Sequence, residues 1–233
     1  MQKQVYFYIL CISLLFQSCE RREILEYRYE ENPQYSWGEV YFWGADYANY
    51  GLENNVLSLV AFTDSLSLDS KSVFQGFGQY LFLEDIFISP GDIFISPGDT
   101  LFPSGIYKVS DSGDSLTIAP GELFEEDGVK SDLGAYIYFI EKNEHFTTRK
   151  FIVDGSMIVS YTENSIYFYF DFILNDDTKL KGRFETNELV VYNESVTLKN
   201  TEKKITLNQA DPFLVKQFVN KQRYKRKSKY TSQ

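Results

Sequence analysis

Few side chains in this sequence are able to do acid–base or nucleophilic chemistry, and their spacing fits no catalytic pattern. His145 is the only histidine, and its place beside Glu144 at the start of an expected strand is ordinary for a surface residue. The two cysteines, Cys11 and Cys19, both lie in the first 19 residues. The sequence has no glycine-rich phosphate loop, no HExxH, no zinc-ligand spacing and no GxSxG. We therefore expect no enzyme, no bound metal and no cofactor.

Carboxylates are plentiful, but their arrangement is uninformative. Glu122, Glu125, Glu126 and Asp127 form a cluster, and Asp111 with Asp114 and Asp176 with Asp177 lie in expected turns. Paired carboxylates serve glycoside hydrolysis or calcium binding, but neither turn pair has EF-hand spacing. We interpret them as turn and solvated acids. A hydrolase would need two buried carboxylates about 5 to 10 Å apart across a cleft.

Aromatic residues are the better functional signal, with 20 Phe, 18 Tyr and 2 Trp in 233 residues. Exposed Tyr and Trp provide rigid, amphipathic contact area for sugars or proteins. The alternative is that they pack in the core or cover one end of a barrel. The candidate ligand-binding aromatics are Trp37, Tyr41, Trp43, Tyr47, Tyr50, Tyr167 and Tyr169.

The N-terminus has the order of a secretory signal: Lys3, then a twelve-residue apolar run over 5–16, then Ser18 and Cys19. Twelve helical residues rise only about 18 Å, against a hydrocarbon core of about 30 Å. The run is therefore too short to span a membrane.

The sequence LLFQSC over 14–19 resembles the lipobox of bacterial lipoproteins, with departures at Phe16 and Gln17. The resemblance implies cleavage after residue 18 and a diacylglyceryl thioether, often with an N-acyl chain such as palmitate, on Cys19. Two or more acyl chains hold a protein stably on a bilayer. Glu20 is not the aspartate that retains enteric lipoproteins at the inner membrane, which favours the outer membrane. We expect a signal peptide over 1–18 and a lipidated tether over 19–36.

The clearest strand is expected over 165–174, where Ile166, Phe168, Phe170, Phe172 and Leu174 alternate with Tyr167, Tyr169, Asp171 and Ile173. A period of two places the first set in the core and the second near water. The turn at 175–177 and the return over 178–186 then predict a hairpin.

The rest of the body also reads as short strands separated by turns. The pattern predicts an all-β domain over 37–208, a single antiparallel barrel or sandwich of roughly ten to twelve short strands. One of the predicted turns is Asp154-Gly155. Further strands are expected over 38–43, 55–62, 77–88, 105–110, 115–119, 135–141, 146–153, 157–161, 195–198 and 204–207.

The heptapeptide DIFISPG occurs twice in succession, over 85–91 and 92–98. An odd repeat cannot continue one straight strand without exchanging its inward and outward residues, and Ser-Pro-Gly interrupts a ladder. One copy should therefore lie in the sheet and the other should protrude as a loop or hairpin arm. An exposed Ile-Phe-Ile edge is also suited to adding a strand to a partner.

Charge divides the chain into an acidic body and a basic tail. Residues 20–210 carry 32 Asp/Glu against 15 Lys/Arg, and residues 211–233 carry seven Lys/Arg against one Asp. An acidic body disfavours nucleic acid as a partner. Over 209–233 we expect a short helix, begun by Asp211-Pro212 and docked through Leu214 and Phe218, and then a basic tail.

Three tripeptides resemble the Asp-Ser/Thr-apolar acceptor for O-glycosylation in secreted proteins of the Bacteroidota type, with acceptors Ser65, Thr100 and Ser115. Asp-Ser is also ordinary turn chemistry. The segments YFWGADY over 41–47, PSGIYKV over 103–109 and KGRF over 181–184 resemble a loose pattern among all-β envelope lipoproteins of that type.

The resemblance implies an envelope lipoprotein, held to the bilayer through Cys19, with no catalytic residues to transfer. Our first hypothesis is a non-catalytic binding module for a glycan or an envelope protein at the outer membrane. The second is a structural or assembly subunit of a surface complex, which predicts a free sheet edge near residues 85–98.

Overall fold

A computed structural model describes residues 30–68, 74–92, 95–96, 99–100, 102–126, 128–140 and 147–195. The expected signal peptide, Cys19, His145, and the helix and tail over 209–233 lie outside these residues. In the described ranges, no helix has the length and apolar character needed to cross a membrane.

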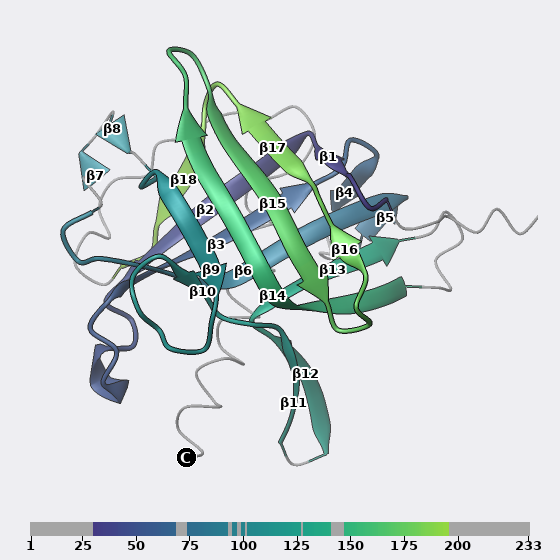
Figure 1. Cartoon of the computed structure of the whole chain (residues 1–233), viewed down its shortest axis with the longest axis horizontal. Helices are drawn as coiled ribbons and strands as arrows, with labels where there is room; N and C mark the ends of the chain where they lie inside the picture. The colour runs from purple at the N-terminus through teal and green to yellow at the C-terminus, as the bar shows by residue number, and fades with distance from the viewer. Residues whose placement is uncertain are drawn as a thin grey trace, which may run out of the picture.

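The fold is all-β, and its main element is a 12-stranded sheet that closes on itself (Figure 1). β1 and β2 follow one another in the chain, with only Ser36 between them. β1 pairs with β17 at one side of the sheet and β2 pairs with β3 at the other, so this continuous segment joins the two sides and closes the sheet. In Figure 1, β14, β15 and β17 cross in front of β2, β3 and β6. The strands are β1 (Gln34–Tyr35), β2 (Trp37–Gly44), β3 (Asn55–Phe62), β6 (Gly78–Ile88), β9 (Gly105–Val109), β10 (Thr117–Ile118), β13 (Ala135–Ile140), β14 (Thr147–Tyr161), β15 (Ile166–Leu174), β16 (Lys179–Leu180), β17 (Arg183–Thr186) and β18 (Val190–Asn193).

The sheet is mostly antiparallel, which corrects the purely antiparallel expectation. Three pairings are parallel: β1 with β17, β9 with β10, and β2 with β18. Smaller elements lie beside the sheet: the 3-10 helix η1 (Ala48–Tyr50) and three two-stranded ribbons. The ribbons are β4 (Leu66–Leu68) with β5 (Phe74–Gly76), β7 (Ile95–Ser96) with β8 (Asp99–Thr100), and β11 (Glu122–Glu126) with β12 (Val129–Leu133).

The two halves of the closed sheet differ in how many faces they bury. β2, β3 and β6 are buried at nearly every position, and their sequences are almost continuous apolar runs. One hydrophobic cluster fills the interior, and a second, with Trp37, Tyr80 and Phe82, covers the outer face of this half. On the other half, β15 alternates buried and exposed positions, so its outer face meets solvent.

The alternation predicted for 165–174 is confirmed. Phe168, Phe170 and Phe172 are all buried in the interior cluster, whereas Tyr169 and Asp171 are exposed. The predicted hairpin is also confirmed, because β15 pairs with both β16 and β17.

The predicted turn at Asp154-Gly155 is wrong, because these residues lie inside the single 15-residue strand β14. The register against β15 shifts between Ile152 and Asp154, which marks a β-bulge. Gly155 has φ +109°, and a Cβ there would lie 2.2 Å from the carbonyl oxygen of Asp171. The Asp-Gly pair therefore bends one long strand instead of reversing the chain.

The two DIFISPG copies separate as expected. Residues 85–88 of the first copy complete β6 within the main sheet. Ile95–Ser96 of the second copy forms β7, which over the described ranges pairs with β8 in a two-stranded ribbon off the main sheet, at the left of Figure 1.

The sheet begins earlier than expected, inside the segment interpreted as tether. Tyr35 pairs with Phe184, and the backbone N–H of Lys181 donates to the carbonyl of Glu31 over 2.6 Å. The first strand of the sheet therefore begins at Gln34, three residues before the expected domain start at 37.

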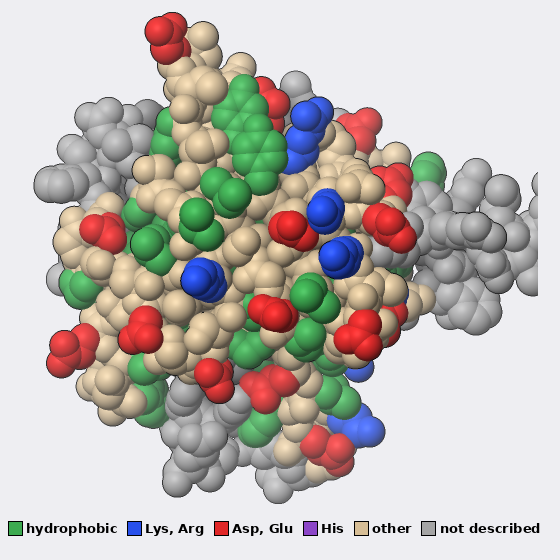
Figure 2. Space-filling view, viewed as in Figure 1, with side chains coloured by type: hydrophobic (Ala, Val, Ile, Leu, Met, Phe, Trp, Pro, Cys, Tyr) green, Lys and Arg blue, Asp and Glu red, His purple; other side chains and the backbone are tan. Residues whose placement is uncertain are grey.

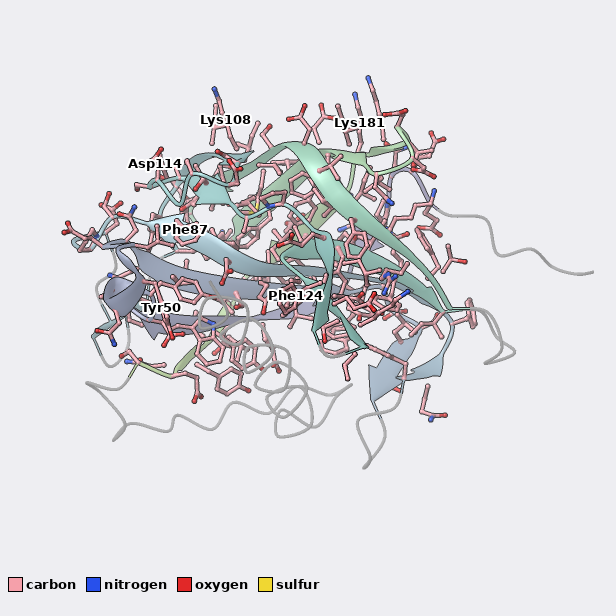
Figure 3. All side chains as sticks on the ribbon, turned by 90° about the horizontal axis from the view of Figure 1, so that it is seen from below. Tyr50, Phe87, Lys108, Asp114, Phe124 and Lys181 are labelled. Carbon is pink, nitrogen blue, oxygen red and sulfur yellow. The ribbon has the colours of Figure 1, made fainter. Side chains whose placement is uncertain are left out.

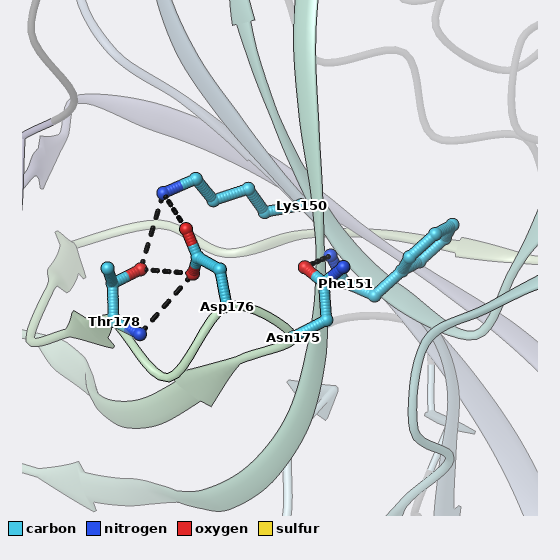
Figure 4. A network of polar contacts seen from close by, with 5 residues as sticks. All are labelled: Lys150, Phe151, Asn175, Asp176 and Thr178. Carbon is cyan, nitrogen blue, oxygen red and sulfur yellow. Dashed lines mark hydrogen bonds and ion pairs between the residues drawn. The ribbon is translucent and has the colours of Figure 1, made fainter.

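A network of hydrogen bonds and one ion pair stabilises the turn that follows β15 (Figure 4). Lys150 Nζ lies 2.7 Å from Asp176 Oδ2, and the Thr178 hydroxyl donates to Asp176 Oδ1 over 2.6 Å. Partial burial acts to raise the pKa of Asp176, but the hydrogen bonds from Lys150 and Thr178 outweigh it and lower the pKa from 3.8 to about 2.

Replacing Asp176 with Asn should lower the free energy of unfolding at pH 7 by a few tenths to about 1 kcal/mol, since the pair is partly solvated. A lowered folded-state pKa contributes stability above pH 3.8, and that stability is lost as the pH falls toward 2. Denaturant unfolding at both ends of this range measures the change. Asp177→Asn is the matched control, because φ at Asp177 is +63° and Asn tolerates that conformation. An equal effect from both variants would contradict the prediction.

Candidate ligand-binding surface

Four of the seven candidate aromatics are buried on the outer side of β2 and in the loop after it. Trp37 stacks on Phe62 with ring centroids 3.9 Å apart, and Trp43 Nε1 donates to Ser58 Oγ over 2.8 Å. The Tyr47 hydroxyl donates to the Asp85 carboxylate over 3.0 Å, and Tyr41 is fully buried. A buried ring offers no face to a ligand, so these four are not part of the surface proposed below.

Within the part of the chain that the structure describes, three carboxylates are buried, and each accepts a hydrogen bond from a donor in the fold. The Tyr41 hydroxyl donates to Glu39 Oε2 over 2.6 Å, and the backbone N–H of Gly134 donates to Glu84 Oε2 over 2.7 Å. The third, Asp85, accepts the bond from Tyr47. Burial raises the pKa of Glu39 from 4.5 to about 7, although the bond from Tyr41 acts to lower it. These contacts give the carboxylates a structural role in packing the doubly buried half of the sheet.

The other two strand aromatics, Tyr167 and Tyr169, lie on the solvent-facing side of β15. Tyr169 is 43 % exposed and Tyr167 is partly exposed. Their rings are parallel to within 5°, with centroids 6.0 Å apart. Figure 2 views this side of the molecule and shows a narrow hydrophobic strip over the upper part of β14 and β15. The structure therefore holds two similarly oriented aromatic rings side by side at the surface.

Strand register continues this surface across four strands. Tyr169 is opposite Ile158 on β14 and Arg183 on β17, and Ile158 is opposite Ile106 on β9. Ile106 and Ile158 are 56 % and 43 % exposed. In the next row, Tyr167 is opposite Ser160 and Glu185. We call these seven residues the tyrosine surface: Ile106, Ile158, Ser160, Tyr167, Tyr169, Arg183 and Glu185.

Each tyrosine of this surface has an uncharged neighbour on β14 and a charged neighbour on β17. Arg183 Nε donates to Gln34 Oε1, which positions the guanidinium while its other N–H groups remain as donors. Two residues beyond Tyr169, and on the same side of the strand, Asp171 Oδ2 lies 3.9 Å from Lys181 Nζ. Lys108 and Lys181, labelled in Figure 3, project from the same side of the molecule. Aromatic faces with adjacent hydrogen-bond donors and acceptors suit a ligand that is apolar on its faces and polar at its edges.

Tyr50, the remaining aromatic candidate, ends η1 and is 40 % exposed, with an edge-to-face contact to Tyr47 at 6.4 Å. Among the expected modification sites, Ser65 is exposed in a turn, and Ser115 is partly buried with its hydroxyl 2.9 Å from that of Ser89. The side chain of Thr100 lies outside what the structure describes. Over the described ranges, no group of three or more His, Cys, Asp or Glu side chains is placed to hold a metal ion.

Five members of the tyrosine surface were not singled out in the sequence: Ile106, Ile158, Ser160, Arg183 and Glu185. Arg183 and Glu185 alternate with Leu180 and Phe184 along the return of the predicted hairpin, so parity alone places them on the tyrosine side of the sheet. Ile106 and Ile158 carry no such signal, because an isoleucine in a strand reads as a core residue.

The fold and this surface define an all-β protein with a closed sheet and a solvent-facing pair of aromatic rings. No protein-family model matches the chain, no curated protein matches it, and no solved structure matches it.

Proposed function

We propose that this protein is a lipid-anchored envelope protein that acts as a non-catalytic binding module, with the tyrosine surface as its ligand-binding site. The observation that carries the proposal is the parallel, solvent-facing pair of Tyr169, which is exposed, and Tyr167, which is partly exposed. Rigid aromatic side chains at a surface contribute contact area with little loss of conformational entropy on binding.

The position of this pair supports a role in binding rather than in stability. Elsewhere in the closed sheet most of the described large aromatics belong to one of two hydrophobic clusters or pack against one, whereas Tyr169 leaves 43 % of its surface in water and Tyr161, at the end of β14, leaves 41 %. The interior side of the same strand is already occupied by Phe168 and Phe170, so the core does not need the tyrosine rings.

The binding role is tested by placing a diazirine photo-crosslinking amino acid at position 158 in intact cells. We expect adducts that disappear when Tyr167 and Tyr169 are both replaced by Ala. The matched control is the same amino acid at position 129, since Val129 is 63 % exposed on the separate β11–β12 ribbon. Adducts that survive the double substitution, or that form equally at 129, would argue against the proposal.

The proposed anchor is the acylated Cys19, and the proposed location is the outer membrane. Metabolic labelling with a palmitate analogue should mark the wild-type chain and not Cys19→Ala, and the variant should leave the membrane fraction, because it lacks the acyl chains. Equal labelling or equal fractionation of the two chains would remove this part of the proposal.

A structural or assembly role is the second candidate, and one observation favours it. Among the described residues, Ile95–Ser96 of the second DIFISPG copy pairs with Asp99–Thr100 in a two-stranded ribbon off the main sheet, and each strand of such a ribbon has a free edge. Strand addition at such an edge predicts self-association. Sedimentation of the detergent-solubilised chain as a single monomeric species over a wide concentration range would contradict this role.

A further inference from the structure

We infer that the ligand of the tyrosine surface is an uncharged polysaccharide in an extended conformation, bound with neighbouring pyranose rings over Tyr167 and Tyr169. This inference rests on the proposed function and specifies its ligand. Four observations carry it: the geometry of the rings, the groups beside them, the balance of charge, and the distribution of apolar area.

The geometry suits a ligand that repeats. Two aromatic rings parallel to within 5° and 6.0 Å apart offer equivalent contacts to two successive units of one chain. The spacing is comparable with the length of one pyranose residue, and the axial C–H groups of a pyranose form an apolar face that packs on an aromatic ring. Because both rings project from one strand, the ligand would run along β15.

The groups beside the rings suit the hydroxyls at the edge of a sugar. Glu185 is opposite Tyr167 and Arg183 is opposite Tyr169, so each ring has one charged hydrogen-bonding group on its β17 side. Glu185 is an acceptor and Arg183 a donor, which together match the dual character of hydroxyl groups. On the β14 side, Tyr167 is opposite the small, polar side chain of Ser160.

The charges around the rings favour an uncharged ligand. We count the charged residues among Tyr167, Tyr169, Asp171 and their cross-strand neighbours on β9, β14 and β17, together with Lys181, which pairs with Asp171. This set includes three cations and two anions. These are Lys108, Lys181 and Arg183 against Asp171 and Glu185. The whole chain, in contrast, has a net charge of −10. A surface with this near balance has no strong attraction for a polyanion or a polycation.

The apolar area favours a glycan over a protein. A standard protein interface buries about 800 Å² on each partner, and its centre is depleted of charged residues. Here Arg183 lies directly beside Tyr169, and Asp171, which pairs with Lys181, is two residues further along the same side of the strand. A narrow aromatic strip bordered by charged groups is suited to a thin, hydroxyl-rich chain.

Affinity electrophoresis of the detergent-solubilised full-length chain tests the inference. The probes are hydroxyethylcellulose, galactomannan and soluble starch as uncharged polysaccharides, and polygalacturonate as a charged one. We expect retardation by at least one uncharged probe and none by polygalacturonate. Tyr167→Ala and Tyr169→Ala should each weaken binding about tenfold, as expected for one lost ring contact.

Two control variants separate ring stacking from other effects. Tyr169→Phe keeps the ring and should stay within about threefold of wild type, since only the hydroxyl is lost. Tyr50→Ala removes an aromatic that is 40 % exposed at another site and should leave retardation unchanged.

Three outcomes would overturn the inference: no retardation by any uncharged probe, retardation unchanged in the Tyr167→Ala/Tyr169→Ala double variant, or retardation by polygalacturonate alone. If one of these outcomes is found but tyrosine-dependent adducts still form at position 158 in cells, the proposed ligand class is wrong and the proposed binding function is retained. If those adducts are absent as well, both proposals fail.

Discussion

Replacing Phe168 with Ala should lower the free energy of unfolding by about 3–5 kcal/mol, the usual cost of removing a buried phenyl group from a packed core. Phe168 is fully buried in the interior cluster. Its ring packs edge-to-face on Phe102 at 5.1 Å and stacks on Phe184 from the neighbouring strand at 5.7 Å. The substitution therefore opens a cavity where β15 and β17 pack together.

The matched control is the next residue along the chain. Tyr169→Ala truncates a ring of similar size on the opposite side of the same strand, where 43 % of the side chain is already in water. We expect it to change the free energy of unfolding by no more than about 1 kcal/mol. Chemical denaturation of both variants measures the difference. Similar losses at the two positions would mean that Tyr169 supports the fold, which would weaken its assignment as a ligand contact.

Glu39→Gln should make the protein more stable at pH 8, by up to about 3 kcal/mol, because 1 pKa unit corresponds to about 1.4 kcal/mol. Burial raises the pKa of Glu39 from 4.5 to about 7, so the folded protein holds an unfavourable carboxylate above that pH. A raised folded-state pKa contributes stability that is fully present below pH 4.5 and is lost as the pH rises through 7. The glutamine is neutral throughout, and its amide oxygen is able to accept the hydrogen bond from Tyr41.

The pH dependence distinguishes this effect from a general change in packing. At pH 5 the wild type and Glu39→Gln should differ little, because the carboxyl is then mostly protonated in the folded state. Glu163→Gln, an exposed carboxylate in the turn after β14, is the control and should have little effect at either pH. Equal unfolding free energies of Glu39→Gln and wild type at pH 8 would show that Glu39 is not held in an unfavourable charged state.

Strands with strict alternation were predicted best, because the period of two depends only on neighbours along the chain. β15 and its hairpin partners lie where the alternation placed them. The bounds predicted for β3, Asn55–Phe62, also match, although β3 is an almost continuous apolar run. The turn predicted at Asp154-Gly155 was wrong, because an Asp-Gly dipeptide is found in tight turns and also in β-bulges. Which one forms depends on whether a partner strand continues past it, as β15 does past β14.

For the candidate site, residue type alone did not separate surface aromatics from core aromatics. Trp37 and Tyr41 lie in a region as rich in aromatics as Tyr167 and Tyr169, but β2 is buried on both faces and β15 on only one. Alternation with a polar residue did not separate them either. Tyr169 is followed two positions later by Asp171, and Trp37 is followed two positions later by Glu39, yet Asp171 is exposed and Glu39 is buried.

The sequence by itself determined the all-β class, the inward and outward faces of its most regular strands and the separation of the two DIFISPG copies. These follow from local periodicity and turn chemistry, which are properties of short segments. Only the tertiary structure decided that the sheet closes through β1 and β17, that the outer aromatics of β2 are buried, and that Ile106 and Ile158 extend the tyrosine pair. Each of these depends on strands distant in the chain meeting in one register, and no local pattern specifies that register.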